Sequence, residues 1–327
     1  NMTAMLIARN EALGDCREHG MGGAVGRVYS SADAHYSIRK SAGMVGIGRA
    51  NVVPIATDEN GRMRPDALAA AITQDLAAGR LPVMINATAG TTVQGAFDPI
   101  DAIADVAQEF GMWLHVDGAF GASLLLSRSH RYRLAGVERA DSLTWDAHKM
   151  MGVPLTCSVI LTRHAGLLAK HLSESATYLF QGDADRFNPG TRSIQCGRRN
   201  DLLKLWTAWQ HHGDDGYEAR IDHVMALAAY ATAKINATET MRLRHVPESV
   251  NVCFEVVGKS SSDICAQLHT KGLAMVGTGD VRGRRTVRLV CVDPAMTALD
   301  IDTFFNAVIE VAAELSEGEN DVERLAN

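Results

Sequence analysis

Residues 82–117 read PVMINATAGTTVQGAFDPIDAIADVAQEFGMWLHVD, and this stretch decides the fold. Pro82–Ala87 is a short apolar run, Ile100–Phe110 is an amphipathic stretch, and Trp113–Asp117 is a second apolar run. A strand, a helix and a strand in this order indicate a β-α-β unit, which places both strands parallel in one sheet.

The same alternation continues on both sides of this unit. Upstream we expect a strand at Val52–Ile55 and a helix at Pro65–Leu76, and downstream we expect strands at Ser142–Trp145 and Ser158–Leu161. Repeated alternation of this kind favours an α/β fold with a mostly parallel sheet.

The pattern changes after Gly213. We expect helices and strands here in the order of a small α+β unit: a helix at 217–235, a strand at 249–256, a helix at 261–271, a strand at 286–292 and a helix at 298–315. The sequence therefore predicts a large domain in residues 1–212 and a smaller C-terminal domain in residues 213–327.

Composition argues against several classes of protein. The chain has 327 residues and a formal net charge of −6. Its densest basic cluster is Arg282, Arg284, Arg285 and Arg288, and we interpret the first three as a solvated loop that leads into a strand. No nucleic-acid-binding face is therefore expected. No apolar run reaches the roughly 20 residues of a membrane span.

The spacing of the cysteines indicates the compartment of the protein. None of the six cysteines is spaced C-x-x-C, which argues against zinc and thioredoxin-like sites. A reducing compartment fits best, so we expect a cytoplasmic protein.

Asn1–Arg9 has the pattern of a helix interior with no start signal before it, so we expect the natural protein to continue upstream.

Chemistry-bearing side chains occur at the ends of the expected strands. Asp117 ends one strand, Thr91-Thr92 and His148-Lys149 follow two others, and His35 follows an apolar run at 28–30. Taken singly, each has an ordinary structural explanation, such as a turn aspartate or a solvated lysine. Parallel sheets bind ligands at the carboxyl ends of their strands, so the common location of these residues predicts one site.

Pyridoxal phosphate (PLP) chemistry needs this set of residue types. An amine must bind the cofactor covalently, and a carboxylate must keep the pyridine nitrogen protonated so that the ring accepts electrons. An imidazole or aromatic ring fixes the tilt of the pyridine, and hydroxyl or N–H groups bind the phosphate.

The sequence resembles the group II PLP-dependent decarboxylases, which include glutamate, cysteine-sulfinate and aromatic amino-acid decarboxylases. The resemblance covers nearly the whole chain and is closest to the glutamate and cysteine-sulfinate branch. The matching stretches are DAHYS at 33–37, GTTVQGAFDP at 90–99, HVDGAFG at 115–121, ADSLTWDAHKMMG at 140–152 and SIQCGR at 193–198. The resemblance implies PLP fold type I, the fold of aspartate aminotransferase.

The resemblance also implies a role for individual residues. Lys149 is similar to the lysine that binds PLP covalently, and His148 is similar to its neighbour near the phosphate. Asp117 matches the partner of the pyridine nitrogen, and Ala119 matches the small residue against the ring. His35 matches the stacking imidazole, Thr92 a threonine beside the cofactor, Tyr178 the proton donor to the substrate carbon, and Arg288 an arginine that binds the α-carboxylate.

Two departures from the family pattern are visible. Asp146 stands where the family often has Asn close to the cofactor phosphate, and a carboxylate there should be repelled unless it turns away or is protonated. The family's phosphate-binding turn precedes the first residue of this sequence.

The expected activity is decarboxylation of a small acidic amino acid: glutamate, aspartate or cysteine sulfinate. An aromatic amino-acid decarboxylase, an aminotransferase, a carbon–carbon lyase, an aldehyde synthase and a cofactor-free relative remain alternatives. From the family we expect a homodimer with sites at its interface, in which the loop around Tyr178 reaches one site or the other, and no nucleic-acid, membrane or metal partner.

Overall fold

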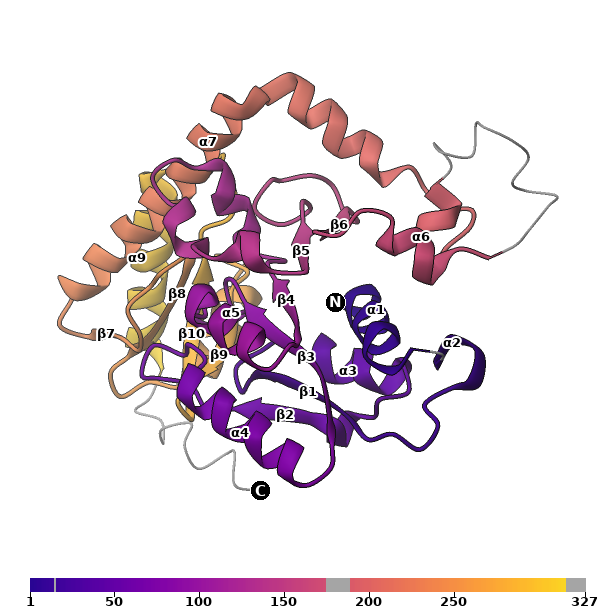
Figure 1. Ribbon diagram of the computed structural model, residues 1–327. Helices are drawn as coiled ribbons and strands as arrows, with labels where there is room; N and C mark the ends of the chain where they lie inside the picture. Colours follow the sequence, from indigo (N-terminus) through magenta and orange to yellow (C-terminus); the bar gives the residue numbers. More distant parts are fainter. Residues whose placement is uncertain (15, 175–188, 316–327) are drawn as a thin grey trace.

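The computed structural model describes residues 1–14, 16–174 and 189–315, and it contains two β-sheets (Figure 1). The larger sheet has six strands in the order β2-β1-β3-β4-β5-β6. All neighbouring pairs are parallel except β5 and β6, which are antiparallel. The strands are β1 Gly26–Ser31, β2 Val52–Ile55, β3 Leu81–Thr88, β4 Trp113–Asp117, β5 Ser142–Asp146 and β6 Ser158–Thr162. The prediction of a mostly parallel α/β sheet is confirmed.

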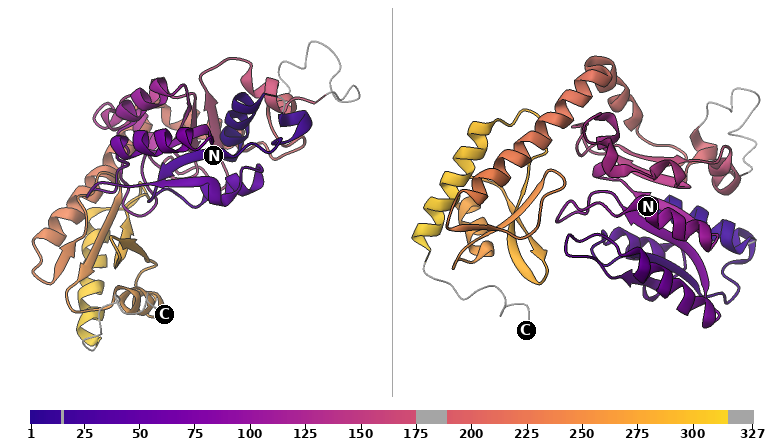
Figure 2. Two further views of the ribbon diagram at one scale, coloured as in Figure 1. Left: turned by 60° about the horizontal axis from the view of Figure 1, so that its bottom comes forward. Right: turned by 60° about the vertical axis from the view of Figure 1, so that its left-hand side comes forward.

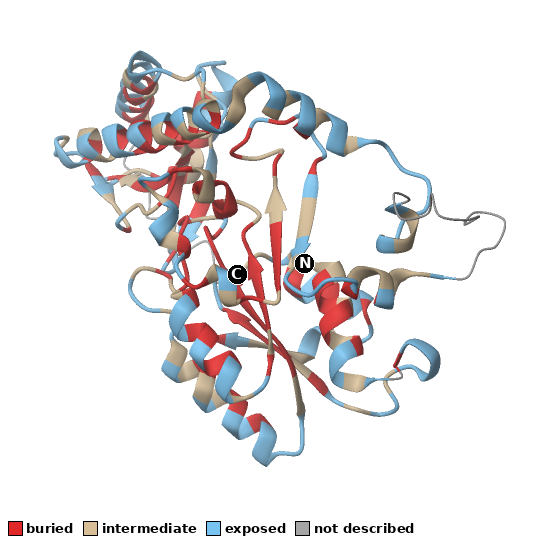
Figure 3. Cartoon of the chain, turned by 45° about the horizontal axis from the view of Figure 1, so that its top comes forward, coloured by how far each residue is buried: buried red, intermediate tan, exposed pale blue. Residues whose placement is uncertain are grey.

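Both faces of this sheet are covered, which explains why its central strands carry apolar residues on both faces. Val28 and Met84 contribute to a core with α1 (Met2–Leu13) and α3 (Ser37–Met44). Their neighbours Tyr29 and Ile85 point to the opposite face, into a core with α4 (Pro65–Ala77) and α5 (Ile100–Glu109). Figure 3 shows the resulting band of buried central strands.

The smaller sheet is antiparallel, with strand order β7-β8-β10-β9. One face packs on helices, as Figure 2 shows, and Phe254 and Phe305 meet there with ring centroids 5.5 Å apart. The opposite face meets a loop of the larger sheet, where Asn251 Nδ2 donates to Thr92 O at 2.9 Å. The elements are β7 Met241–Leu243, β8 Asn251–Val256, α8 Ser261–Thr270, β9 Gly277–Val281, β10 Arg284–Val290 and α9 Ala298–Glu314.

The long helix α7 (Asp201–Asn236) connects the two sheets. It begins 16 residues before the predicted start at 217 and is interrupted at Gly213, where φ is 64°. Glycine adopts a positive φ without steric cost, so the break in the helix falls at a residue that tolerates this conformation. The predicted domain boundary between 212 and 213 falls at this break and stays a prediction.

The short strands β7 and β9 were not predicted, and His35 lies two residues before the start of α3. The interpretation of Arg284 and Arg285 as loop residues is wrong, because both belong to β10. Within the described ranges, no helix combines the length and the hydropathy of a membrane span.

Candidate active site

A cavity of about 290 Å³ lies at the carboxyl ends of β3, β4 and β5. Five of the predicted site residues line it, namely His35, Thr92, Asp117, Ala119 and Lys149. They come from loops or strand ends that are far apart in sequence, and the parallel sheet brings them together. The predicted convergence of these five side chains is therefore present in the structure.

Asp117 is the last residue of β4 and is only 4% exposed. Its Oδ1 accepts the backbone N–H of Ala119 at 3.2 Å, and its Oδ2 accepts from Asn1 Nδ2 at 2.7 Å. Each carboxylate oxygen thus has a donor, which fixes the plane of the group. Ala119 helps to hold this carboxylate through its main chain, in addition to lining the cavity.

Lys149 lies in the turn that follows β5, where its backbone N–H donates to Asp146 O at 3.0 Å. Its Nζ lies 3.2 Å from Asp146 Oδ2 and 5.6 Å from the centroid of the Phe120 ring. The carboxylate that was in doubt as a phosphate neighbour is thus an ion-pair partner of the lysine. The side chain of Lys149 is 33% exposed and lines the cavity.

His35 presents an uncharged ring at neutral pH. Burial lowers the pKa of this imidazole below its usual value, while the carboxylates of Asp117 and Asp146 oppose the shift and Lys149 adds to it. The ring of Tyr36 lies beside it, with centroids 4.1 Å apart. A neutral imidazole at the wall of the cavity suits the predicted stacking role.

His148 is adjacent to Lys149 in sequence but is not among the residues that line the cavity. Its Nδ1 lies 3.0 Å from the backbone oxygen and 3.1 Å from the backbone nitrogen of Cys157. Its Nε2 is 3.9 Å from Asp146 Oδ2. The side chain therefore ties the lysine turn to the residue before β6, and its role near a phosphate stays a prediction.

The loop that carries Thr92 is fixed by two neighbours. Thr91 Oγ1 accepts the N–H of Ala96 at 3.0 Å, which makes Thr91 a turn residue. Gly90 has φ 85°, and a Cβ there would lie 3.1 Å from the backbone nitrogen of Gly121. The close approach of these two backbones places the loop against the cavity.

Asp98 anchors the other end of this loop. It is buried, with one carboxylate oxygen accepting the N–H of Met63 at 2.6 Å and the other accepting the N–H of Thr88 at 2.7 Å. Burial raises the pKa of Asp98 to about 7, although the two N–H donors oppose this. The side chain joins the end of β3 to the segment before α4.

Two predicted site residues are not placed in the cavity. Arg288 lies on β10 and is outside the cavity lining, although its Cδ and Val93 both approach Gly279, beside the Thr92 loop. Its Nε is buried and has no hydrogen-bond partner among the described residues. Tyr178 lies outside the described residues. The roles of both stay predictions.

Sequence reasoning missed several polar residues of the cavity, among them Thr88 and Asn1. Thr88 ends β3, so the rule that identified Asp117 could have identified it. Asn1 reaches Asp117 through tertiary contact alone, which no local pattern signals. Thr88 Oγ1 is buried and has no hydrogen-bond partner among the described residues, so it is available to a polar ligand.

These groups fit PLP. An accessible amine, a doubly held carboxylate, a neutral imidazole and an unpaired hydroxyl line the same cavity. PLP needs an amine for covalent attachment, a carboxylate beside its ring nitrogen, a flat ring to stack against and polar contacts, and these four groups supply them.

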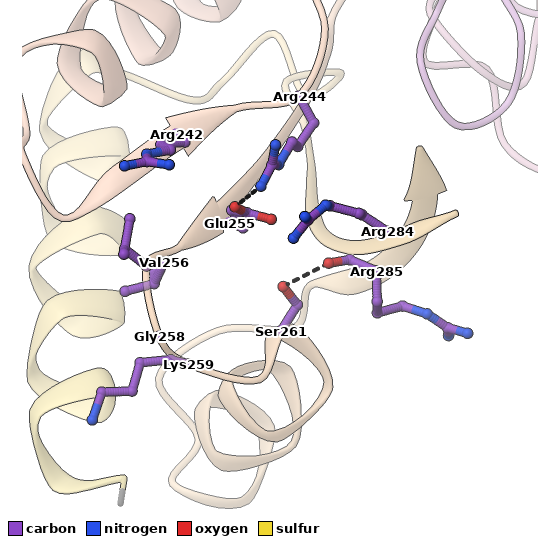
Figure 4. A pocket seen from close by; sticks show the side chains of 10 residues that line it. Arg242, Arg244, Glu255, Val256, Gly258, Lys259, Ser261, Arg284 and Arg285 are labelled. Atoms are coloured by element: carbon purple, nitrogen blue, oxygen red, sulfur yellow. Dashed lines mark hydrogen bonds and ion pairs between the residues drawn. The ribbon is translucent and has the colours of Figure 1, made fainter. Parts of the chain in front are cut away.

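A second cavity, of about 260 Å³, lies on the smaller sheet, away from Lys149 (Figure 4). Arg242, Arg244 and Arg284 gather around Glu255, which forms an ion pair with Arg244. Arg285 instead pairs with Asp280 at 2.6 Å. This cavity offers cations but neither a lysine–aspartate pair nor an imidazole, so the residues that suit PLP are those of the first cavity.

Comparison with known proteins agrees with this geometry. Residues 1–257 match the family described as the pyridoxal-dependent decarboxylase conserved domain. The chain is 41% identical over 326 residues to mouse cysteine sulfinic acid decarboxylase, covering 92% of this chain and 66% of that protein. It is 38% identical to the human protein of the same name, covering 96% and 69%. The chain thus spans about two thirds of the length of these relatives.

Solved structures of decarboxylases are also similar to this chain. The crystal structure of mouse CSAD superposes with a TM-score of 0.90 at 36% identity, over 96% of this chain and 70% of that one. The crystal structure of Oryza sativa TDC with PLP and tryptamine superposes with a TM-score of 0.89 at 26% identity, over 96% and 68%. The predictions of fold type I and of PLP as the cofactor are confirmed. The chain belongs to the pyridoxal-dependent decarboxylase family, as its sequence motifs predicted.

Proposed function

We propose that this protein is a PLP-dependent carboxy-lyase that converts a small acidic amino acid to its amine and CO2. The observation that carries the proposal is the convergence of Lys149, Asp117 and His35 on one cavity in a chain of this family. The relatives named for cysteine sulfinic acid favour that compound as the substrate, with glutamate and aspartate as the other candidates.

Each of these residues has a separate proposed role. Lys149 Nζ would hold PLP covalently until the substrate amine binds in its place. Asp117 would hold a proton at the pyridine nitrogen, and His35 would supply a flat, uncharged surface for the ring. When bound, PLP supplies the electron sink for the bond between Cα and the carboxylate. Tyr178 is the proposed proton donor to Cα, and Arg288 is the proposed partner of the α-carboxylate.

A substrate screen tests this function. The full-length protein, loaded with PLP, is incubated with cysteine sulfinate, glutamate, aspartate and an aromatic amino acid, and CO2 and amine are measured separately. We expect equal amounts of CO2 and amine from an acidic substrate. Lys149→Ala is the control, because it removes the amine. Turnover of the aromatic substrate alone would contradict the substrate class, and formation of keto acid or aldehyde without amine would contradict the reaction.

We further propose a homodimer with its sites at the interface. Leu202, Leu203 and Trp206 in the first half of α7 are 63%, 53% and 58% exposed. Exposed apolar side chains on one helix are typical of a surface covered by a partner, and a second copy is the usual partner. Sedimentation of the full-length protein should give a dimer, and Trp206→Ser should weaken it. A monomer at micromolar concentration would contradict this proposal.

A reducing, cytoplasmic location is also proposed. Within the described ranges all six cysteines are free, which is the state expected in that compartment. Cell fractionation with the full-length protein would test the location, and recovery with an oxidising compartment would contradict it.

A further inference from the structure

A continuous chain of hydrogen bonds leads from Trp113 to Asp117. Trp113 Nε1 donates to Ser142 Oγ at 2.9 Å, and Ser142 Oγ lies 2.9 Å from His115 Nδ1. His115 Nε2 lies 3.0 Å from Asn1 Oδ1, and Asn1 Nδ2 donates to Asp117 Oδ2 at 2.7 Å. Three of these residues, Ser142, His115 and Trp113, contribute nothing to the cavity lining.

The donors and acceptors in this chain can be assigned from chemistry. An indole nitrogen can only donate, so Ser142 Oγ accepts from Trp113 and has its own hydrogen left for His115 Nδ1. His115 is completely buried, and burial lowers the pKa of its imidazole well below the usual value. A neutral imidazole that accepts at Nδ1 carries its hydrogen on Nε2.

The orientation of Asn1 selects this tautomer. A carboxylate can only accept, so the amide nitrogen of Asn1 faces Asp117 and its amide oxygen faces the imidazole. That oxygen accepts the Nε2–H of His115, with Thr144 Oγ1 at 3.3 Å as a second acceptor. The amide nitrogen then faces Asp117 and also donates to Ser37 Oγ at 2.9 Å. With the opposite tautomer, His115 Nε2 and Asn1 Oδ1 would both be acceptors at 3.0 Å, which is unfavourable.

We propose that His115 and Asn1 are positioning residues that hold the Asp117 carboxylate in the orientation in which it pairs with the pyridine nitrogen of PLP, so that this nitrogen stays protonated. The proposal rests on the function proposed above and adds two residues to which the family resemblance gives no role. A hydrogen bond to a carboxylate is stronger than one between neutral groups, so the Asn1 contact holds the plane of Asp117 firmly. The Ala119 N–H then fixes the other oxygen.

The test separates a positioning role from simple loss of structure. His115→Leu removes both ring nitrogens, whereas His115→Gln can still place a side-chain N–H toward Asn1 Oδ1. Each variant, as the full-length protein, is loaded with PLP that carries nitrogen-15 in its ring. The nitrogen-15 NMR shift reports directly whether that nitrogen is protonated, and it does not depend on turnover.

We expect His115→Leu to bind PLP at full stoichiometry and to shift the ring signal toward the unprotonated position. It should lower kcat by at most roughly 10- to 100-fold, the factor expected if the hydrogen bond from Asn1 to the Asp117 carboxylate is lost completely. His115→Gln should restore most of the wild-type signal and rate. Ser142→Ala, a small change that should fold even if His115→Leu does not, should shift the signal in the same direction by less.

Asp117→Asn provides the reference signal for the unprotonated ring. If it shifts the signal but His115→Leu and Ser142→Ala leave it at the wild-type position, the proposal is overturned. If Asp117→Asn itself leaves the signal and the rate unchanged, or the wild-type protein binds no PLP, the function proposed above fails instead. A lower melting temperature in His115→Leu with an unchanged ring signal counts against positioning, since it shows a structural role alone.

Discussion

Replacing Asp98 with Asn should change how the free energy of unfolding depends on pH. The two carboxylate oxygens of Asp98 accept the backbone N–H groups of Met63 and Thr88. An amide has only one oxygen, so one of these buried N–H groups loses its acceptor in Asp98→Asn. Leaving a buried donor unsatisfied costs about 1–3 kcal/mol.

The pH dependence follows from linkage. The pKa of Asp98 is raised to about 7 in the folded protein, against roughly 3.9 in an unfolded chain. Between these values the folded state retains a proton that the unfolded state has released, so the stability due to this group is fully present below about pH 4 and is lost as pH rises through 7. A shift of about 3 units at 1.36 kcal/mol per unit gives about 4 kcal/mol. Asn does not titrate and should not show this loss.

Urea unfolding of wild type and Asp98→Asn at a series of pH values from about 5 to 8 measures the effect. The variant should be about 1–3 kcal/mol less stable than wild type near pH 5. Wild type should then lose about 3 kcal/mol between pH 5 and pH 7, so the difference should vanish or reverse by pH 8. The other titrating groups are common to both proteins and cancel in the difference. A difference that stays constant over this range would refute the raised pKa of Asp98.

Two further predictions concern stability. Gly90→Ala should lower the melting temperature, because its φ of 85° and a Cβ contact of 3.1 Å with the backbone of Gly121 cost about 1–3 kcal/mol; an unchanged melting temperature would mean that the two backbones separate easily. Burial and the nearby Arg282 lower the pKa of His245 to about 4. The free energy of unfolding should therefore fall by about 3 kcal/mol as the pH falls from about 6.5 to 4. His245→Gln can still donate to the backbone oxygen of Gln94 and should unfold less readily than wild type in acid; equal acid sensitivity in denaturant titrations would contradict this.

The features that could be predicted from the sequence are those that local pattern determines. β3 and β4 are buried on both faces, so they appear as mostly apolar runs, and a parallel sheet places residues at strand ends in one site. Asp117 and Lys149 could be identified for this reason. β9 contains Gly277 and Gly279 and lacks an apolar run, which explains why it was missed.

Other features depend on contacts between distant segments and leave no local signal. The hydrogen bond from Asn1 to Asp117 joins residues 116 positions apart. The separation of Arg288 from the cavity depends on how β10 packs against the Thr92 loop, and the ion pair of Asp146 with Lys149 depends on the shape of one turn. Such features are decided by tertiary packing, which spacing and composition do not encode.

The covalent attachment of PLP to Lys149 tests the central claim most directly. The full-length protein is incubated with PLP, reduced with borohydride and digested, and the peptides are analysed by mass spectrometry. We predict a phosphopyridoxyl group on Lys149, bound at one per chain, and no such group in Lys149→Ala. A label on another lysine, or no label at all in wild type that binds PLP, would contradict the assignment of this site.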